Sequence, residues 1–388
     1  MDKKLLGLFL YWRLFLFLPL FVANMVIPAR RGYEYTLLSH FINGDSPLNY
    51  FLLSPFVNFD GVYYLMISGA GYTVNAGFFP LFPLVLKFLN LPFGTVHHFT
   101  ITQYVLATIL VNVIGFLVAV FFYKLVRLDY DKEAGFYAVL GLLFFPTAFF
   151  LASFYSEGLF LLLTIVAFLF ARKKKWVFAG ISGVLLTATR VVGIAILPAL
   201  LVEWYIWWKS SGKKFSVRIF LTSLLPTLMT PLGLIGYMVY NAVKWGDALY
   251  FVHAQGNFAN SRSVYGVILL PQTLVRYAKI LTSVSPGQFE WWIALLEVTA
   301  VLFGITMLFV AWKKKVRVSY LVFAVIAFLI PSSTGTFTGM PRYVLVLFPI
   351  FIALTLLKNS KIRFALYAVF FVLQILLFTL FAKGYFIS

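Results

Sequence analysis

The chain lacks cysteine altogether and contains few acidic residues. Disulfide bonds, thiol catalysis and thiolate metal sites are therefore excluded. Its 388 residues include 12 Asp and Glu and 31 Lys and Arg, and charged residues make up only 11% of the chain. No P-loop, GxGxxG or HExxH arrangement occurs. ATP-driven transport, dinucleotide chemistry and zincin-type proteolysis therefore have no support in the sequence.

Apolar and aromatic residues dominate what is present. Hydrophobic residues make up 62% of the chain and aromatic residues 20%, which excludes an ordinary soluble domain. A net charge of +19 would suggest a polyanion partner in a soluble protein. Here, however, Lys and Arg fall in short clusters between apolar runs, as they do in cytoplasmic loops of membrane proteins. We therefore expect no nucleic acid partner, but anionic membrane lipids and a lipid phosphate substrate.

The apolar runs predict an all-α polytopic membrane protein with one domain over 1–388. A spanning helix needs about 20 mostly apolar residues, and eleven segments are candidates. The basic clusters between them all become cytoplasmic if the N-terminus is cytoplasmic, 5–27 is an uncleaved signal anchor and 78–92 does not cross. The predicted spans are 5–27, 100–126, 134–152, 156–172, 176–189, 191–208, 218–243, 291–312, 317–331, 344–357 and 363–383.

The outer face of the cell membrane then receives the long and chemically mixed connections. The first of these, 28–98, is expected to carry short interfacial helices. Because ionisable groups collect in the outer connections, we expect the function to reside on the extracytoplasmic side. The groups concerned are His40, His97, His98, His253, Glu34, Asp45, Asp60, Glu157, Asp247 and Glu290.

Asp60 is the acid that carries most information. It begins a predicted short helix, 60–70, and tyrosines together with a Phe/Pro cluster at 78–83 could form a sugar-stacking platform beside it. One interpretation is a helix cap; the other is a functional acid at the membrane face. The tyrosines are Tyr63, Tyr64 and Tyr72.

Glu157 lies at an outer turn and could be a first-turn acid favoured by the helix dipole. It could also converge with Asp60 on one site, where one carboxylate acts as a base and the other orients a hydroxyl or a divalent cation such as Mg or Mn. His253 with Asp247 makes at best a weak metal or acceptor site.

Arg190 and Arg342 each interrupt or flank an apolar run at an outer turn. Both could extend toward lipid headgroups. A guanidinium group can also bind a phosphate through two hydrogen bonds, and two such turns favour phosphate recognition.

Taken together, these motifs resemble the PIG-V type mannosyltransferases, GPI mannosyltransferase 2 and its prokaryotic relatives. The departure is Phe59, where relatives usually have Trp, so the indole donor is lost. The matching stretches run in the family's order: Asn58-Phe59-Asp60-Gly61 through Gly71-Tyr72, Phe78-Phe79-Pro80-Leu81-Phe82-Pro83, Phe145-Pro146-Thr147 with Tyr155-Ser156-Glu157, Thr187-Ala188-Thr189-Arg190, Gly246-Asp247-Ala248 through His253-Ala254-Gln255, and Arg342-Tyr343 before Phe348-Pro349.

The resemblance implies a GT-C glycosyltransferase with its active site in the first outer loop and a polyprenyl- or dolichyl-phosphate sugar as donor. It implies that Asp60 is the base of an inverting transfer, that Arg190 or Arg342 neutralises the departing lipid phosphate, and that Glu157 steers the acceptor or supports a metal. Substrate-binding roles are expected for Asn58, Tyr63, Tyr64, Tyr72 and His253.

Two alternatives remain at this point. A transporter or flippase would move a lipid-linked saccharide without forming a bond, and it predicts broken helices and acids near the midplane of the bilayer. A ligase or polymerase of the same fold would use a lipid-linked oligosaccharide with more than one sugar.

Overall fold

A computed structural model describes residues 3–30, 54–73, 76–93, 101–212, 214–257 and 262–387. These residues are helical apart from loops and one isolated bridge between Ile268 and Thr334, which confirms the predicted all-α class. They form two compact units, Met1–Leu162 with Leu357–Ile387, and Leu163–Leu356. The prediction of one domain over 1–388 stays a prediction. The predicted outer residues Glu34, His40, Asp45, His97 and His98 lie outside the described residues.

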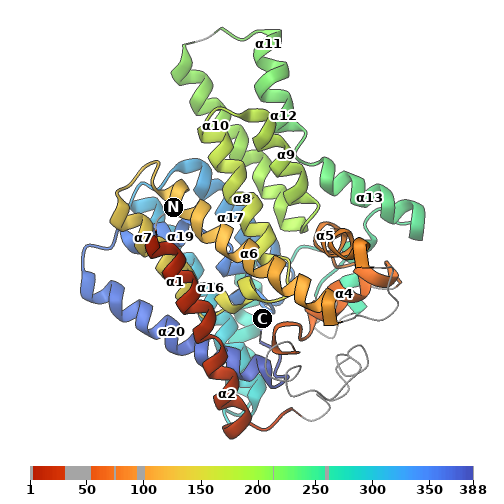
Figure 1. Cartoon of the computed structure of the whole chain (residues 1–388), viewed down its shortest axis with the longest axis vertical. Helices are drawn as coiled ribbons and strands as arrows, with labels where there is room; N and C mark the ends of the chain where they lie inside the picture. Colours follow the sequence, from red (N-terminus) through yellow and green to blue (C-terminus); the bar gives the residue numbers. More distant parts are fainter. Residues whose placement is uncertain are drawn as a thin grey trace. The chain divides into compact units, whose positions relative to one another are not determined.

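Long helices build the first unit. In Figure 1, the red helices α1 and α2 run beside the blue helix α20. Trp12 of α1 donates its indole N–H to the side-chain oxygen of Gln374 in α20 at 3.1 Å, a buried hydrogen bond between the two ends of the chain. The helices are α1 (Lys3–Phe15), α2 (Phe17–Val26), α6 (Ile101–Val126), α7 (Lys132–Phe144) and α20 (Ser360–Ala382).

Two short helices occur in the first predicted outer loop, α4 (Asp60–Ala70) and α5 (Leu81–Asn90). The bounds of α4 are those predicted for the helix 60–70. The two helices pack together through the ring of Tyr64, whose centroid lies 5.1 Å from that of Phe82. At 1.5 Å per residue α5 is about 15 Å long. It is therefore too short to cross a bilayer, in agreement with a segment 78–92 that does not span.

The second unit is a set of helices joined by loops that carry many polar residues. Its helices α9 and α12 pack closely because Gly180 faces the carbonyl oxygen of Pro226, where a Cβ would collide. The helices are α9 (Trp176–Thr187), α10 (Ile196–Ser211), α11 (Val217–Ile219), α12 (Leu225–Leu228), α13 (Leu232–Trp245), α14 (Tyr250–His253), α15 (Leu270–Ser283), α16 (Phe289–Lys313), α17 (Val318–Ser332), α18 (Met340–Leu345) and α19 (Pro349–Thr355), while α8 runs over Glu157–Arg172.

The number of spans differs from the eleven predicted. Among the described residues, five helices are long and apolar enough to cross a membrane: Lys3–Ala23, Gln103–Val126, Val191–Ser211, Phe289–Lys313 and Ser360–Ala382. A sixth span would be the pair Val217–Leu228 and Leu232–Trp245, which is bent by 51°. The structure therefore establishes a multi-pass arrangement but not the predicted count.

Three predicted spans are not continuous helices, and one of them, 218–243, is the bent pair described above. The segment 134–152 is α7 followed by a 3-10 helix, Ala148–Ala152, and the break falls at Pro146. The segment 344–357 is divided between α18 and α19, and α19 begins at Pro349. Proline lacks a backbone N–H and clashes with the preceding turn, so in the interior of an α-helix it kinks or breaks the helix, and here the helices are interrupted at both prolines.

Candidate functional site

Asp60 lies at a strained backbone turn in the first unit. It is the first residue of α4, and Phe59 before it has a φ of 60°. Such a conformation costs a residue other than glycine about 1–3 kcal/mol and persists only where the surroundings impose it. The surroundings here are aromatic, since the Phe59 ring lies 5.4 Å from that of Phe381 and 5.1 Å from that of Phe386.

Asn58 also holds the turn before Asp60 in place. Its side chain is buried and donates to the carbonyl oxygen of Phe381 at 2.9 Å. Its own carbonyl oxygen accepts a hydrogen bond of 2.6 Å from the hydroxyl of Tyr155. The turn that presents the partly exposed Asp60 is therefore held from both sides by long-range contacts.

The three predicted tyrosines have different surroundings. Tyr63 is partly exposed and its ring stacks on that of Phe78 at 5.1 Å with an angle of 22°. Tyr72 donates its hydroxyl to the carbonyl oxygen of Phe78 at 2.6 Å. Tyr64 is buried and its hydroxyl donates to Ser156 at 2.8 Å. Tyr63 and Phe78 therefore form a stacked aromatic pair, with Tyr64 inside the unit, and a platform for a sugar stays a prediction.

Glu157 is the first residue of α8 and is only 1% exposed. The bond from Tyr64 to Ser156 ties α4 to the residue directly before it, so the elements bearing Asp60 and Glu157 meet in the first unit. Among the described residues no group of three or more His, Asp or Glu side chains comes together as a metal site. A metal held by the two carboxylates stays a prediction.

Arg190 and Arg342 come together in the second unit. Arg190 precedes a 3-10 helix, Val191–Ala195, and its guanidinium carbon lies 4.8 Å from the ring centre of Tyr343. Arg342 is the neighbour of Tyr343 in α18 and is 8% exposed. Arg190 and Arg342 therefore both lie beside Tyr343, and a role in phosphate recognition stays a prediction.

A third arginine, which the sequence analysis missed, acts on the same hydroxyl. Burial raises the pKa of Tyr343, but the charges of Arg190, Arg262 and Arg342 and a hydrogen bond from Arg190 outweigh it and lower that pKa to about 8. The field at this hydroxyl therefore favours a negative charge. Arg262 belongs to no motif and lies in the loop before α15, so sequence periodicity contains no signal for it.

His253 pairs with Asp247 as the sequence suggested, through a 2.6 Å contact between Nδ1 and Oδ2. The hydrogen bond with His253 lowers the pKa of Asp247 from its ordinary value. The histidine ring also stacks on Tyr265, with centres 5.2 Å apart. The pair lies in the second unit, whereas Asp60 and Glu157 belong to the first.

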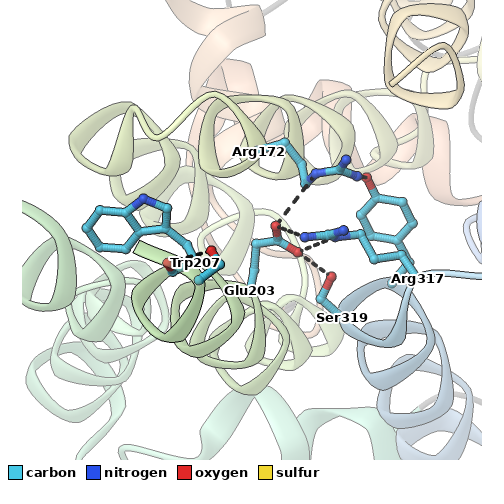
Figure 2. A network of polar contacts seen from close by, with 7 residues as sticks. Arg172, Glu203, Trp207, Arg317 and Ser319 are labelled. Atoms are coloured by element: carbon cyan, nitrogen blue, oxygen red, sulfur yellow. Dashed lines mark hydrogen bonds and ion pairs between the residues drawn. The ribbon is translucent and has the colours of Figure 1, made fainter. Parts of the chain in front are cut away.

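A buried ionic network around Glu203 was also missed (Figure 2). Arg317 donates to both carboxylate oxygens of Glu203, at 2.7 and 2.6 Å, and Ser319 donates at 2.7 Å. Arg172 lies 3.7 Å from the same carboxylate and donates to the hydroxyl of Tyr320 at 2.9 Å. The network joins α8, α10 and α17. The sequence does contain one indication of this network, because Glu203 is a single acid within a mostly apolar segment.

The chain is similar to two solved structures of the oligosaccharyltransferase of Archaeoglobus fulgidus. The apo form has 13% identity and a TM-score of 0.49, and the match covers 99% of this chain and 56% of that one. The form tethered through a disulfide bond to an acceptor peptide containing the NVT sequon has 12% identity and a TM-score of 0.46, with 99% and 55% covered. The chain thus spans little more than half the length of that protein.

None of the curated proteins is similar enough in sequence to count as a match. The family model described as mannosyltransferase (PIG-V) matches residues 3–198, slightly more than half of the chain. The matched part includes the Asp60 turn, Glu157 and Arg190. The chain therefore belongs to the mannosyltransferase (PIG-V) family.

Proposed function

We propose that this chain is a membrane glycosyltransferase that transfers a sugar, mannose, from a polyprenyl- or dolichyl-phosphate donor to a lipid or protein acceptor. Family membership supports the transferase class. The observation that carries the proposal is that the guanidinium carbon of Arg190 lies 4.8 Å from the ring centre of Tyr343, the neighbour of Arg342. Two arginines from distant segments thus come together, which favours the binding of an anion. A transferase whose donor is a lipid-linked sugar phosphate has to neutralise such an anion.

A lipid-linked donor fits the predicted topology. With the N-terminus in the cytoplasm, the first outer loop and its Asp60 face the extracytoplasmic side. Sugar nucleotides stay in the cytoplasm, so a transferase that works outside needs a sugar that a lipid has carried across. Five of the described helices are long and apolar enough to cross a membrane, which supports a donor that is itself anchored in the membrane.

In the proposed reaction the carboxylate of Asp60 accepts the proton of the acceptor hydroxyl. The hydroxyl oxygen attacks the anomeric carbon, the bond from that carbon to the phosphate oxygen breaks, and the electron pair leaves with the lipid phosphate. Attack from the opposite face inverts the anomeric centre. Arg190 and Arg342 stabilise the departing phosphate, an electrostatic contribution of about 2.7–4 kcal/mol per donor in comparable sites.

The neighbours of Asp60 take supporting roles in this proposal. The stacked pair of Tyr63 and Phe78 offers an aromatic face for a sugar ring. Asn58 and Tyr64 hold the turn and α4, and Tyr72 closes the loop toward Phe78. Glu157 orients the acceptor hydroxyl or, with Asp60, supports a divalent cation such as Mg or Mn. His253, the last residue of α14, contacts substrate.

The test is Asp60→Asn, assayed in membranes with polyprenyl-phosphate mannose as donor. Loss of a general base costs about 100- to 10,000-fold in rate. We expect a loss of this size with an unchanged melting temperature, because Asn can occupy the first position of α4. Glu133→Gln changes an exposed acid in the first turn of α7 and serves as the matched control, with full activity expected. Full activity in the Asp60 variant would remove Asp60 from the mechanism.

A flippase of lipid-linked saccharides is the second candidate. One observation favours it, the 51° bend between Val217–Leu228 and Leu232–Trp245, since broken helices are common in transporters. Proteoliposomes that separate product formation from translocation distinguish the two. Translocation of the lipid-linked saccharide without any new glycosidic bond would replace the transferase proposal.

A further inference from the structure

Arg13 is a buried cation inside the first span. It is 9% exposed and lies in the middle of Lys3–Ala23, one of the helices long and apolar enough to cross a membrane. Its Nε donates to Oδ1 of Asn112 in α6 at 2.6 Å. The amide nitrogen of Asn112 donates to the carbonyl oxygen of Thr108 at 2.7 Å, which holds the amide with its oxygen toward Arg13. Arg13 therefore joins α1 to α6 within the first unit in a defined orientation.

The charge of Arg13 is stabilised by aromatic rings and not by an acid. In the part of the chain that the structure describes, no carboxylate pairs with Arg13, and its buried Nη1 has no hydrogen-bond partner. Its guanidinium carbon lies 4.7 Å from the ring centre of Phe17 and 4.2 Å from that of Phe56. A desolvated cation is attracted to the face of an aromatic ring. Because an ionisable group inside a span is costly and usually serves a function, stability alone does not explain an arginine here.

Phe56 connects this cation with the Asp60 turn. It ends a 3-10 helix and precedes Asp60 by four positions (60 minus 56). Its backbone carbonyl oxygen accepts a hydrogen bond of 2.8 Å from the N–H of Phe154. Gly61 also packs on Phe154, since a Cβ at Gly61 would lie 3.4 Å from the carbonyl oxygen of Phe154. The chain on either side of Asp60 is therefore held against Phe154, and Arg13 adds a contact from α1 on the Phe56 side.

The turn depends on contacts of this kind. The positive φ of Phe59 persists only where the surroundings impose it, so a shift of Phe56 lets the backbone relax and moves the carboxylate of Asp60. A general base works only within about 2.6–3.2 Å of the atom whose proton it accepts. A misplacement of about 1 Å, even from a mutation far from the chemistry, costs about 100-fold in rate. A small movement of Phe56 is therefore sufficient to impair a base at position 60.

We propose that Arg13 is a positioning residue for Asp60: its guanidinium group, oriented by Asn112, holds Phe56 and thereby sets where the strained turn presents the carboxylate. This inference rests on the proposed function and deepens it, because it assigns a buried charge of the first span to the placement of the base. Arg13 does not touch the substrate in this role. It acts through Phe56, from the opposite end of the contact that the Phe154 amide makes.

The first test is Arg13→Met, assayed for transfer from polyprenyl-phosphate mannose. We expect kcat to fall about 10- to 100-fold with an unchanged KM for the donor. The melting temperature should stay the same or rise, because an apolar side chain in place of a buried ionic group is often neutral or stabilising. Arg13→Lys keeps a cation over the two rings and should retain more activity than Arg13→Met. Lys4→Met, which removes an exposed basic residue of the same helix, is the matched control with full activity expected.

The second test is amide hydrogen exchange of the full-length protein in nanodiscs, which needs no sugar transfer. Arg13→Met should lose protection in the segment 54–62 and in the peptide that contains Phe154, whose amide is bonded to Phe56, while peptides of α7 keep theirs. Wild-type kcat or wild-type exchange at the turn in Arg13→Met would overturn the inference. So would a lower melting temperature with faster exchange throughout, which would show a merely structural role. Full activity of Asp60→Asn would instead overturn the proposed base, whatever exchange the Arg13 variants show.

Discussion

Substitution of Glu203 by Gln removes the one negative charge from the network in Figure 2 and keeps the size of the side chain. Glu203 is 3% exposed, and its partners Arg172 and Arg317 are 14% and 25% exposed. Removing one partner of a buried ion pair costs about 3–5 kcal/mol, because the other charge is left uncompensated. Here the arginines can be partly rehydrated and Gln still accepts a hydrogen bond.

We therefore expect Glu203→Gln to destabilise the second unit by about 2–3 kcal/mol, somewhat less than the loss for a fully buried pair. For a unit of this size such a change lowers the melting temperature by about 4–12 °C. The assay is thermal unfolding of the purified protein in detergent. Glu290→Gln is the matched control, since Glu290 is an exposed acid in the first turn of α16, and it should change the melting temperature little.

A double-mutant cycle tests whether the loss of stability comes from the interaction between Glu203 and Arg317. Arg317→Gln alone leaves Glu203 buried with Arg172 at 3.7 Å as its remaining ionic partner. The variant with both substitutions should lose less stability than the sum of the two single variants, because it removes the uncompensated charge. Strict additivity, or a melting temperature of Glu203→Gln equal to that of the wild type, would refute the reasoning.

Two further predictions concern the second unit. Gly233→Ala should destabilise it by about 1–3 kcal/mol, because the new Cβ collides with the carbonyl oxygen of Val184 and lies 2.6 Å from Oγ1 of Thr187. The control is Gly236→Ala, one turn along α13, where a Cβ meets nothing within 4 Å. This variant should unfold at the same temperature as the wild type or at a higher one. Equal melting temperatures of the two variants would contradict this. Tyr343 should have a pKa of about 8, below its ordinary value of 10.0. Between pH 8 and pH 10.0 the folded protein therefore binds fewer protons than the unfolded protein, so the stability of the folded state rises with pH. Tyrosinate absorbance in a pH titration checks this, and an early phase that persists in Tyr343→Phe would show that another tyrosine is responsible.

Local sequence was sufficient for the class of the protein and for several elements of the site. The length of the apolar runs predicted a multi-pass helical protein, since the cost of charges in lipid acts on each segment separately. The helix Asp60–Ala70 and the place of Glu157 in the first turn of α8 were predicted with their correct positions. Motif order indicated the family that the match over 3–198 shows.

The wrong and missing predictions concern features that a short stretch of sequence does not encode. Hydropathy averages over a window, so it joined α18 and α19 into one span although Pro349 interrupts the helix. It also passed over Glu203, because one acid barely changes the average of an apolar helix.

What tertiary structure alone decided is which distant charges meet. Arg317 is 114 positions from Glu203. Arg190, Arg262 and Arg342 come from three segments before they act on Tyr343. A single charged side chain has the same local pattern whether it lies in water, reaches a lipid headgroup or pairs inside the protein. Its surroundings, and with them its chemistry, are set by chain segments that only the packing of helices and loops brings within a few ångströms.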